Sequence, residues 1–254
     1  MQFGGLYYCD MDARKPFDSA RGNSISKMSI KDKYSVKPID SYQCKEWCLK
    51  KHYAKRLPPI SHAFGLFDAD NILQGITTYG TPVSSTLRDL WDNKYKLMEL
   101  NRLVINEGLE KNVLSYLVGQ SLGQLPKPLV LVSYADTSKN HHGYIYQATN
   151  WIYTGLSIPF KDVAVRGLEN QHHSTIEDLV RGKENRMEAL REMFGDRLYY
   201  VERPQKHRYF YFIGNKTEVK DMRKMLPYEI EKYPKGENIR YDASYKPTVQ
   251  TSLF

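Results

Sequence analysis

The strongest chemical signal in the sequence is a run of polar residues that follows a buried strand. Residues 129–132 are uniformly apolar, and Ser133-Tyr134-Ala135-Asp136 come directly after them, before the polar loop 137–142. In open α/β sheets, ligands bind beyond the carboxyl ends of the strands, where a carboxylate can accept a proton. Asp136 is therefore the first candidate for a general base. The alternative is that Asp136 and Ser138 only cap a turn.

Other reactive side chains precede this strand. Glu99 and Arg102 are three apart on the expected strand 98–105. A regular strand would point them to opposite faces, whereas a β-bulge would change that. They form either a structural ion pair or part of a site. His52, followed by Tyr53, ends an expected helix, and a histidine there is either a base or metal ligand or an ordinary surface residue.

Aromatic side chains stand next to polar or basic ones in two further segments. Tyr146 and Gln147 are adjacent on the expected helix 143–150, so they point in different directions. Tyr146 and Trp151 either pack under the sheet or form a platform on which a base stacks. An alternating aromatic run at 209–212 comes directly after the basic residues Lys206, His207 and Arg208. This pattern is typical both of a strand and of a surface that faces nucleic acid.

The composition narrows the class of protein. The chain has 254 residues, a net charge of +8 and 20 tyrosines. A basic, aromatic-rich domain favours a polyanionic partner, nucleic acid first, although basic surfaces also serve solubility alone. No apolar run approaches the roughly 20 residues of a membrane helix, and the start lacks the pattern of a secretory signal, so we expect a cytoplasmic protein with no membrane partner. The sequence contains no GxGxxG, P-loop, HExxH or paired CxxC motif.

A mixed α/β framework is expected to position these residues, because strand-like and helix-like periods alternate along the chain. The expected strands are 34–39, 63–67, 75–79, 98–105, 129–133, 151–156, 198–201 and 208–213, and the expected helices are 41–55, 112–124, 143–150 and 217–225. A small hairpin is expected from 163–166 and 171–173. We divide the chain into an N-terminal arm, a catalytic domain with a helical insertion, and a C-terminal tail, at 1–34, 35–230 (insertion about 174–196) and 231–254.

The order of these elements resembles the GNAT acyltransferase fold. In that family the loop that corresponds to 106–111 binds the pyrophosphate of acetyl-CoA through a glycine-rich turn, and here it carries a single glycine. More closely, the chain resembles the bacteriophage Mom family, a divergent GNAT branch that hypermodifies adenine in DNA. The resemblance spans roughly residues 36–215 and rests on ordered blocks: Lys51-His52-Tyr53, Glu99-Leu100-Asn101-Arg102-Leu103, Ser133 to Asp136, Gly143 to Gly155, and Lys206 to Phe212.

The resemblance implies transfer of a carbamoylmethyl (glycinamide-like) group to the N6 amine of adenine, which shields phage DNA from restriction. The implied partner is double-stranded DNA with a flipped adenine, and a homodimer is an open assembly state. The donor is unknown and is not expected to be plain acetyl-CoA. A metal-dependent mechanism with iron is attached to the family, and His52 with Asp136 would supply two ligands. Carried over by position, the catalytic candidates are Asp136, His52, Tyr53, Arg102, Ser133, Tyr134, Tyr146 and Gln147, and the nucleic-acid-binding candidates are Lys206, His207, Arg208 and Trp151.

The adenine amine is a poor nucleophile, so an enzyme that acts on it must flip the base, stack it and accept a proton. Asp136 or His52 would be the base, and Arg102 would hold an anionic part of the donor. Two other functions remain open. A GNAT-like N-acyltransferase would act on a hypermodified pyrimidine, tRNA or a small amine. A nonenzymatic module would bind DNA in a salt-dependent way and leave no covalent product.

Overall fold

A seven-stranded mixed sheet forms the centre of the protein. The computed structural model describes residues 29–82, 84–91, 94–171, 173–237, 245 and 247. Along the sheet the order is β1-β2-β3-β4-β5-β9-β6, and every neighbouring pair is antiparallel except β4 and β5. The strands are β1 (Ser35–Pro38), β2 (His62–Phe67), β3 (Leu73–Gly80), β4 (Leu97–Ile105), β5 (Leu129–Asp136), β6 (Ile152–Leu156) and β9 (Lys206–Ile213). The expected mixed α/β fold is confirmed.

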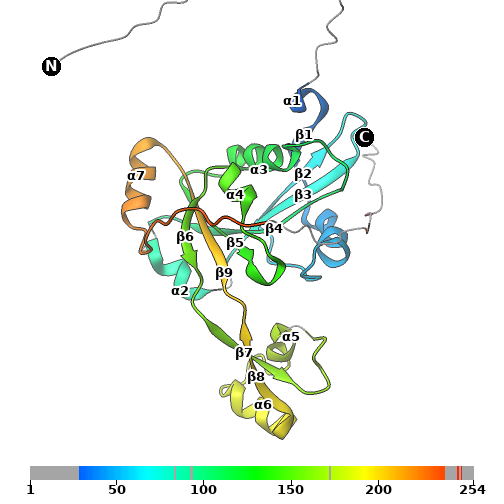
Figure 1. Ribbon diagram of the computed structural model, residues 1–254, viewed down its shortest axis with the longest axis vertical. Coiled ribbons are helices and arrows are strands. Elements are labelled where there is room, and N and C mark those ends of the chain that lie inside the picture. Colours follow the sequence, from blue (N-terminus) through cyan, green and yellow to red (C-terminus); the bar gives the residue numbers. More distant parts are fainter. Residues whose placement is uncertain are drawn as a thin grey trace, which may run out of the picture.

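Helices cover both faces of this sheet (Figure 1). One face, which we call the α3 face, packs against α3 and α4 through side chains such as Val118, Leu122 and Tyr146. The opposite face, the η2 face, packs against η1 and η2 through Trp47 and against η3 and α7 elsewhere. The helical elements of this body are α1 (Ile30–Lys33), η1 (Ser41–Cys44), η2 (Trp47–Lys51), α2 (Ser85–Arg88), η3 (Asp89–Trp91), α3 (Val113–Gln124), η4 (Thr137–Lys139), α4 (Tyr144–Ala148) and α7 (Lys216–Lys224).

Residues 157–205, which we call the insertion, separate β6 from β9 and project from one end of the sheet (Figure 1). They contain β7 (Phe160–Val165), α5 (His173–Asp178), α6 (Arg186–Phe194), η5 (Gly195–Arg197) and β8 (Leu198–Arg203). The strands β7 and β8 pair with each other, and Val165, Ile176, Val180 and Leu190 form a separate small core. The hairpin expected from 163–166 and 171–173 is therefore wrong, because the partner of β7 lies after both helices.

The ends of the chain fall partly within the described residues. Of the expected N-terminal arm, residues 1–28 lie outside them, and Ile30–Lys33 forms the helix α1. The first residues of the expected tail follow β6, since the Glu231 amide donates to the Tyr153 carbonyl at 3.0 Å and the Tyr233 hydroxyl donates to the Trp151 carbonyl at 2.7 Å. Within the described part of the chain, every helix is too short or too polar to cross a membrane.

Candidate active site

The strands β4 and β5 separate from each other in the middle of the sheet. Their parallel pairing covers only Leu97–Glu99 against Val130–Val132, after which β4 stays with β3 and β5 stays with β9. At the point of separation, the Ser133 hydroxyl donates to the Leu100 carbonyl at 2.8 Å. Because that uses its single proton, the Tyr146 hydroxyl must donate to Ser133 Oγ across their 2.7 Å contact. Ser133 and Tyr146 therefore brace the place where the strands part.

A β-bulge at Asn101 changes the facing of the side chains on β4. Thr78 pairs with Arg102 and Tyr79 with Leu100, which leaves Asn101 without a partner in the ladder. Its side chain is held instead, with Oδ1 2.6 Å from the Thr78 hydroxyl and Nδ2 2.8 Å from the Pro59 carbonyl. The extra residue shifts the alternation by one position. Glu99 and Arg102 consequently lie on the same face, the η2 face.

Glu99 carries the most unusual carboxyl group of this region. Burial raises its pKa to about 7, although the positive charges of Lys206 and Arg102 pull it down. The residue as a whole keeps partial exposure. A carboxyl whose pKa lies near neutral pH can both accept and return a proton under physiological conditions. Glu99 is thus equipped to act as a general base.

Arg102 is a fixed positive charge beside Glu99. Its Nη1 donates to the Asn101 carbonyl at 2.6 Å, and its Nη2 and Nε donate to the Arg56 carbonyl at 2.9 and 3.3 Å. Burial lowers its pKa, yet a guanidinium remains protonated throughout the physiological range. These backbone contacts orient the planar group, so Arg102 holds its charge in one position.

His52 and Tyr53 lie at the end of η2, on the same side of the sheet. His52 is buried, and burial, with the nearby charge of Arg102, lowers its pKa to about 3. Its Nδ1 accepts from the Ala54 amide at 3.1 Å, which places the proton of the neutral ring on Nε2. The ring stacks on Tyr53 at 4.3 Å between centroids, and Tyr53 meets His141 at 5.9 Å. His52 is therefore neutral and a weaker base than Glu99.

Asp136 ends β5 on the η2 face and caps the turn η4. Its Oδ1 accepts from the Ser138 amide at 2.9 Å and from the Ser138 hydroxyl at 2.7 Å. Tyr134 is two positions earlier on the same face, and burial raises the pKa of its phenol. The turn cap considered for Asp136 from the sequence is present.

The sheet divides the expected catalytic residues into two groups. His52, Tyr53, Arg102, Tyr134 and Asp136 lie on the η2 face with Glu99. Ser133, Tyr146 and Gln147 lie on the α3 face, inside an aromatic cluster. There Tyr146 is buried against Trp151 and Tyr209, and Gln147 Nε2 donates to the His142 and Pro234 carbonyls at 3.0 and 3.2 Å. The second group supports the site from behind.

Three of the four expected nucleic-acid contacts are inside the fold. Trp151 has no exposed surface, and the His207 ring lies 2.8 Å from the Tyr153 hydroxyl through Nδ1. Arg208 donates to Thr154 Oγ1 and the Thr154 carbonyl at 3.0 and 2.9 Å, with its guanidinium 3.5 Å from the Tyr228 ring centroid. The prediction that Trp151, His207 and Arg208 contact nucleic acid directly does not fit the structure, because their side chains are buried.

The loop before α3 is lined with ion pairs. Glu107 binds the buried ammonium of Lys51 at 2.9 Å, and Glu110 binds Lys33 at 2.7 Å. Asn112, at the start of α3, has a left-handed φ of 73° and makes no side-chain cap. A helix N-terminus attracts phosphate, and here Lys51 and Lys33, which reach the loop, are already paired with its carboxylates. The expectation, from the single glycine of the loop, that the donor is not plain acetyl-CoA stays a prediction.

Comparison with known protein families shows which family this chain belongs to. Residues 33–235, well over half of the sequence, match the Mom protein family. The chain belongs to the Mom protein family. No curated protein matches it. The resemblance found in the sequence is thus confirmed at the level of the family.

Several solved acetyltransferases overlap this Mom-family chain loosely. A GNAT-family acetyltransferase from Bacillus cereus is 12% identical, with a TM-score of 0.35 over 70% of this chain and 96% of that one. An N-acetyltransferase from Staphylococcus aureus is 11% identical, with a TM-score of 0.38 over 70% and 98%. A spermidine/spermine N-acetyltransferase from Vibrio cholerae, in complex with manganese ions, is 10% identical, with a TM-score of 0.38 over 77% and 99%.

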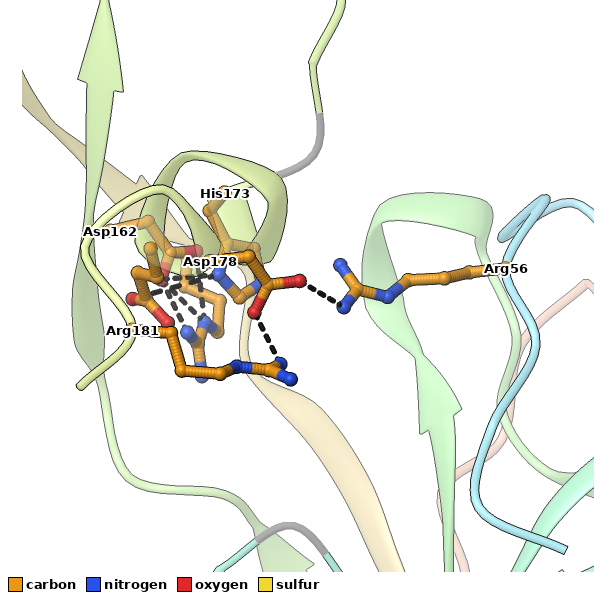
Figure 2. A network of polar contacts seen from close by, with 7 residues as sticks. Arg56, Asp162, His173, Asp178 and Arg181 are labelled. Carbon is orange, nitrogen blue, oxygen red and sulfur yellow. Dashed lines mark hydrogen bonds and ion pairs between the residues drawn. The ribbon is translucent and has the colours of Figure 1, made fainter.

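An iron site at His52 and Asp136 does not fit the Mom-family chain. His52 Nδ1 accepts from the Ala54 amide, so Nε2 carries the ring proton and neither nitrogen offers a lone pair to a metal, while Asp136 Oδ1 accepts from the Ser138 amide. Among the described residues, one group of potential ligands has its atoms within 4.8 Å of one another, and it lies in the insertion: Asp162, His173 and Glu177. The Asp162 carboxylate there is neutralised by Arg203, whose Nε lies 2.9 and 3.0 Å from its oxygens (Figure 2). No step of the reaction is therefore assigned to a metal.

Glu99 and Lys206 have positions in the structure that the sequence alone did not indicate. Glu99 was recognised as a reactive group but not as a site residue, because its partnership with Arg102 depends on the bulge. Lys206 was expected to contact nucleic acid. It pairs with Asp136 across β5 and β9, and its charge acts on both Glu99 and His52. The feature of the sequence that could have indicated Glu99 is a glutamate within the otherwise largely apolar segment 97–105.

Proposed function

We propose that this Mom-family chain is a DNA-modifying transferase that places a carbamoylmethyl group on the N6 amine of adenine, with Glu99 as the base. The family relationship supports the class of reaction. The observation that carries the assignment of the base is the Glu99 carboxyl, with its pKa raised to about 7 at the place where β4 and β5 part. Protection of phage DNA from restriction would be the biological result.

The chemistry is alkylation of a nitrogen, in which the carbamoylmethyl group moves from the leaving group of the donor to N6. The N6 amine attacks the methylene carbon of a carbamoylmethyl donor, so an N–C bond forms while the bond from that carbon to the leaving group breaks. The leaving group takes the bonding electrons, and Glu99 accepts the proton that N6 loses and later returns it to water. Arg102 favours the ionised form of Glu99. The protonated phenol of Tyr134, on the same face of the sheet, would donate to the donor's carbonyl or leaving group.

The acceptor must leave the base stack to reach this chemistry. Taking adenine out of a duplex exposes its amine and its faces, and aromatic side chains then hold the base. Tyr53, which is partly exposed and stacks on the buried His52 near Arg102, offers such a surface. The charge of +8 supports binding of the phosphate backbone, with Lys206 near the site. Double-stranded DNA is the proposed partner.

Asp136 remains the second candidate for the base. It lies on the same face as Glu99, but it caps a turn and one of its oxygens accepts two hydrogen bonds from Ser138. Paired variants separate the two roles. Glu99→Gln is expected to abolish modification in a folded protein, whereas Asp136→Asn is expected to reduce it through a loosened turn.

Mass spectrometry of nucleosides from expressing cells tests the proposal. A new adenine adduct with the mass of a carbamoylmethyl group is expected in DNA from cells with the wild-type chain, and plasmid from these cells should resist restriction enzymes whose sites contain adenine. Adducts confined to pyrimidines, tRNA or small amines would favour the N-acyltransferase alternative and contradict adenine as the acceptor. Full modification by Glu99→Gln would remove Glu99 from the mechanism.

A further inference from the structure

A row of exposed apolar side chains runs along the root of the insertion. Leu156 is 42% exposed, Ile158 78% and Phe160 53%. They alternate with Ser157 and Pro159, and the residue before a proline is held extended. In an extended segment, alternate side chains point to the same side. Leu156, Ile158 and Phe160 therefore form one apolar row, in which Ile158 is the most exposed large apolar residue of the described chain.

Hydrogen bonds fix this row next to the candidate active site. The Ser157 amide donates to the Lys206 carbonyl at 2.8 Å, and the Lys206 amide donates to the Ser157 hydroxyl at 2.9 Å. Gln205 Nε2 donates to the Ser157 carbonyl at 2.6 Å, and the Thr137 hydroxyl donates to the Gln205 carbonyl at 2.5 Å. Lys206 is hydrogen-bonded to Ser157, which follows Leu156, and its charge acts on Glu99. The apolar row therefore begins next to a residue of the site.

Polar contacts hold the rest of the insertion against the body of the protein (Figure 2). The Arg203 guanidinium lies 4.8 Å from the centroid of the Phe160 ring and also clamps Asp162, which approaches His173 of α5 at 3.5 Å. From α5, Asp178 reaches across to Arg56 at 3.2 Å. The carbonyl of Arg56 in turn receives Arg102. These contacts connect the hairpin, through α5, to the segment that carries Arg56 and so to Arg102.

The charge of the insertion points to an apolar rather than an electrostatic contact. Residues 157–205 contain eight basic and nine acidic residues, so the insertion carries a net charge of −1 and the remainder of the chain carries +9. Phosphate binding is thus a task for the body, where the charge of Lys206 acts on Glu99 and Lys139 follows Asp136 in the turn η4. An exposed apolar row beside such a cationic surface matches one particular ligand, a base stack flanked by phosphates.

We infer that Leu156, Ile158 and Phe160 form a wedge that enters the duplex beside the flipped adenine. This inference rests on the proposed function. Proteins that distort DNA insert leucine, isoleucine or phenylalanine between base steps, and the inserted groups offset the cost of unstacking. Ile158 enters the stack, and Phe160, held by Arg203, lines the path between the duplex and Glu99.

Full-length variants and duplexes that carry 2-aminopurine in place of one adenine, with random flanking sequence, test the wedge. The analogue is either paired with thymine or mismatched, and its fluorescence rises when it unstacks. Ile158→Ser is expected to weaken binding to the paired duplex roughly tenfold and to suppress the rise in fluorescence, because the wedge no longer offsets unpairing. Binding to the mismatched duplex, which is already destabilised, should stay unchanged.

Two variants control for structure and shape. Ile158→Leu keeps an apolar side chain and should behave like the wild type. Met193→Ala, at a residue of α6 that is 54% exposed, removes a similar apolar surface away from the row and should have no effect. Equal loss on paired and mismatched duplexes, or wild-type binding by Ile158→Ser, would overturn the wedge. A wild-type chain that neither binds duplex DNA nor forms an adenine adduct would instead overturn the proposed function, and the wedge with it.

Discussion

Glu99 and Arg102 lie on the same face of β4 although three positions separate them, because Asn101 forms a bulge between them. The bulge thereby brings a buried carboxyl and a fixed guanidinium into each other's field. Burial raises the pKa of Glu99, and the neighbouring cations limit the rise, so that the pKa comes to about 7. Neither effect alone would leave the group ready to exchange protons at neutral pH.

The rate of adenine modification is expected to rise with pH through the pKa of Glu99, about 7, and to level off above it. The base works only in its ionised form, and that form becomes dominant above the pKa. The measurement is the yield of adduct in cell extract containing the purified chain and plasmid, at graded pH. Lys206 and Arg102 both lower this pKa, so the Arg102→Met variant, which lacks the second of these cations, should shift the midpoint upward. A profile without an inflection near neutrality would exclude Glu99 as the base.

The same raised pKa makes the fold depend on pH. The protonated form of Glu99 is favoured in the folded state, so its contribution to stability is fully present below the ordinary pKa of 4.5 and is lost as pH rises through about 7. Glu99→Gln mimics the protonated form. It should raise the free energy of unfolding at alkaline pH by up to about 3 kcal/mol and change it little under acidic conditions.

Denaturant unfolding of both chains at acidic and alkaline pH measures this difference. Glu192→Gln, on the exposed surface of α6, is the matched control and should leave the pH dependence of the wild type intact. Equal stability of Glu99→Gln and wild type at alkaline pH would show that the Glu99 carboxylate is well solvated.

Removing the brace at the separation of β4 and β5 is expected to destabilise the fold. Ser133→Ala takes away the hydroxyl that the Leu100 carbonyl and the Tyr146 hydroxyl share, and should cost about 1–3 kcal/mol. Tyr146→Phe leaves the bond between Ser133 and Leu100 in place and should cost less. Thermal and denaturant unfolding of the two single variants and the double variant provide the measurement. Additive losses would mean that the two hydroxyls act independently.

Coenzyme A is expected not to stabilise the chain. A pyrophosphate at the start of α3 would meet Glu107 and Glu110, and Lys51 and Lys33 are already paired with them. Thermal unfolding with and without a large excess of coenzyme A is the measurement, and inorganic pyrophosphate is the control ligand. A saturable rise in melting temperature with coenzyme A would show that the loop rearranges to accept it.

Local periodicity was sufficient for much of the sheet. The expected strand 98–105 corresponds to Leu97–Ile105, and the expected helix 112–124 to Val113–Gln124, because each buries one regular stripe or face. The split between Ser133 on one face and Asp136 on the other also follows from the alternation of a strand. The location of Glu99 and Arg102 on the same face does not follow from this alternation. Nothing in the local sequence shows that Asn101 interrupts the pairing of β4 with β3.

The errors arise where contacts span long stretches of sequence. The partner of β7 comes after two helices, so a search among neighbouring residues selects 171–173 instead. His207 and Arg208 look like surface residues when β9 is considered alone, but β9 lies between β5 and β6 and is covered on both faces. Burial of this kind depends on the order of the strands in the sheet, and that order is a property of the whole chain.

The position of β9 between β5 and β6 also governs how the chain folds during synthesis. Until residues 206–213 leave the ribosome, β5 and β6 present unpaired edges, which are templates for pairing with other chains. The insertion extends this interval, because all of it is translated before the last strand of the sheet. Premature termination or slow translation before residues 206–213 have emerged would therefore yield an aggregating product, while a pause after they have emerged would be harmless to the sheet.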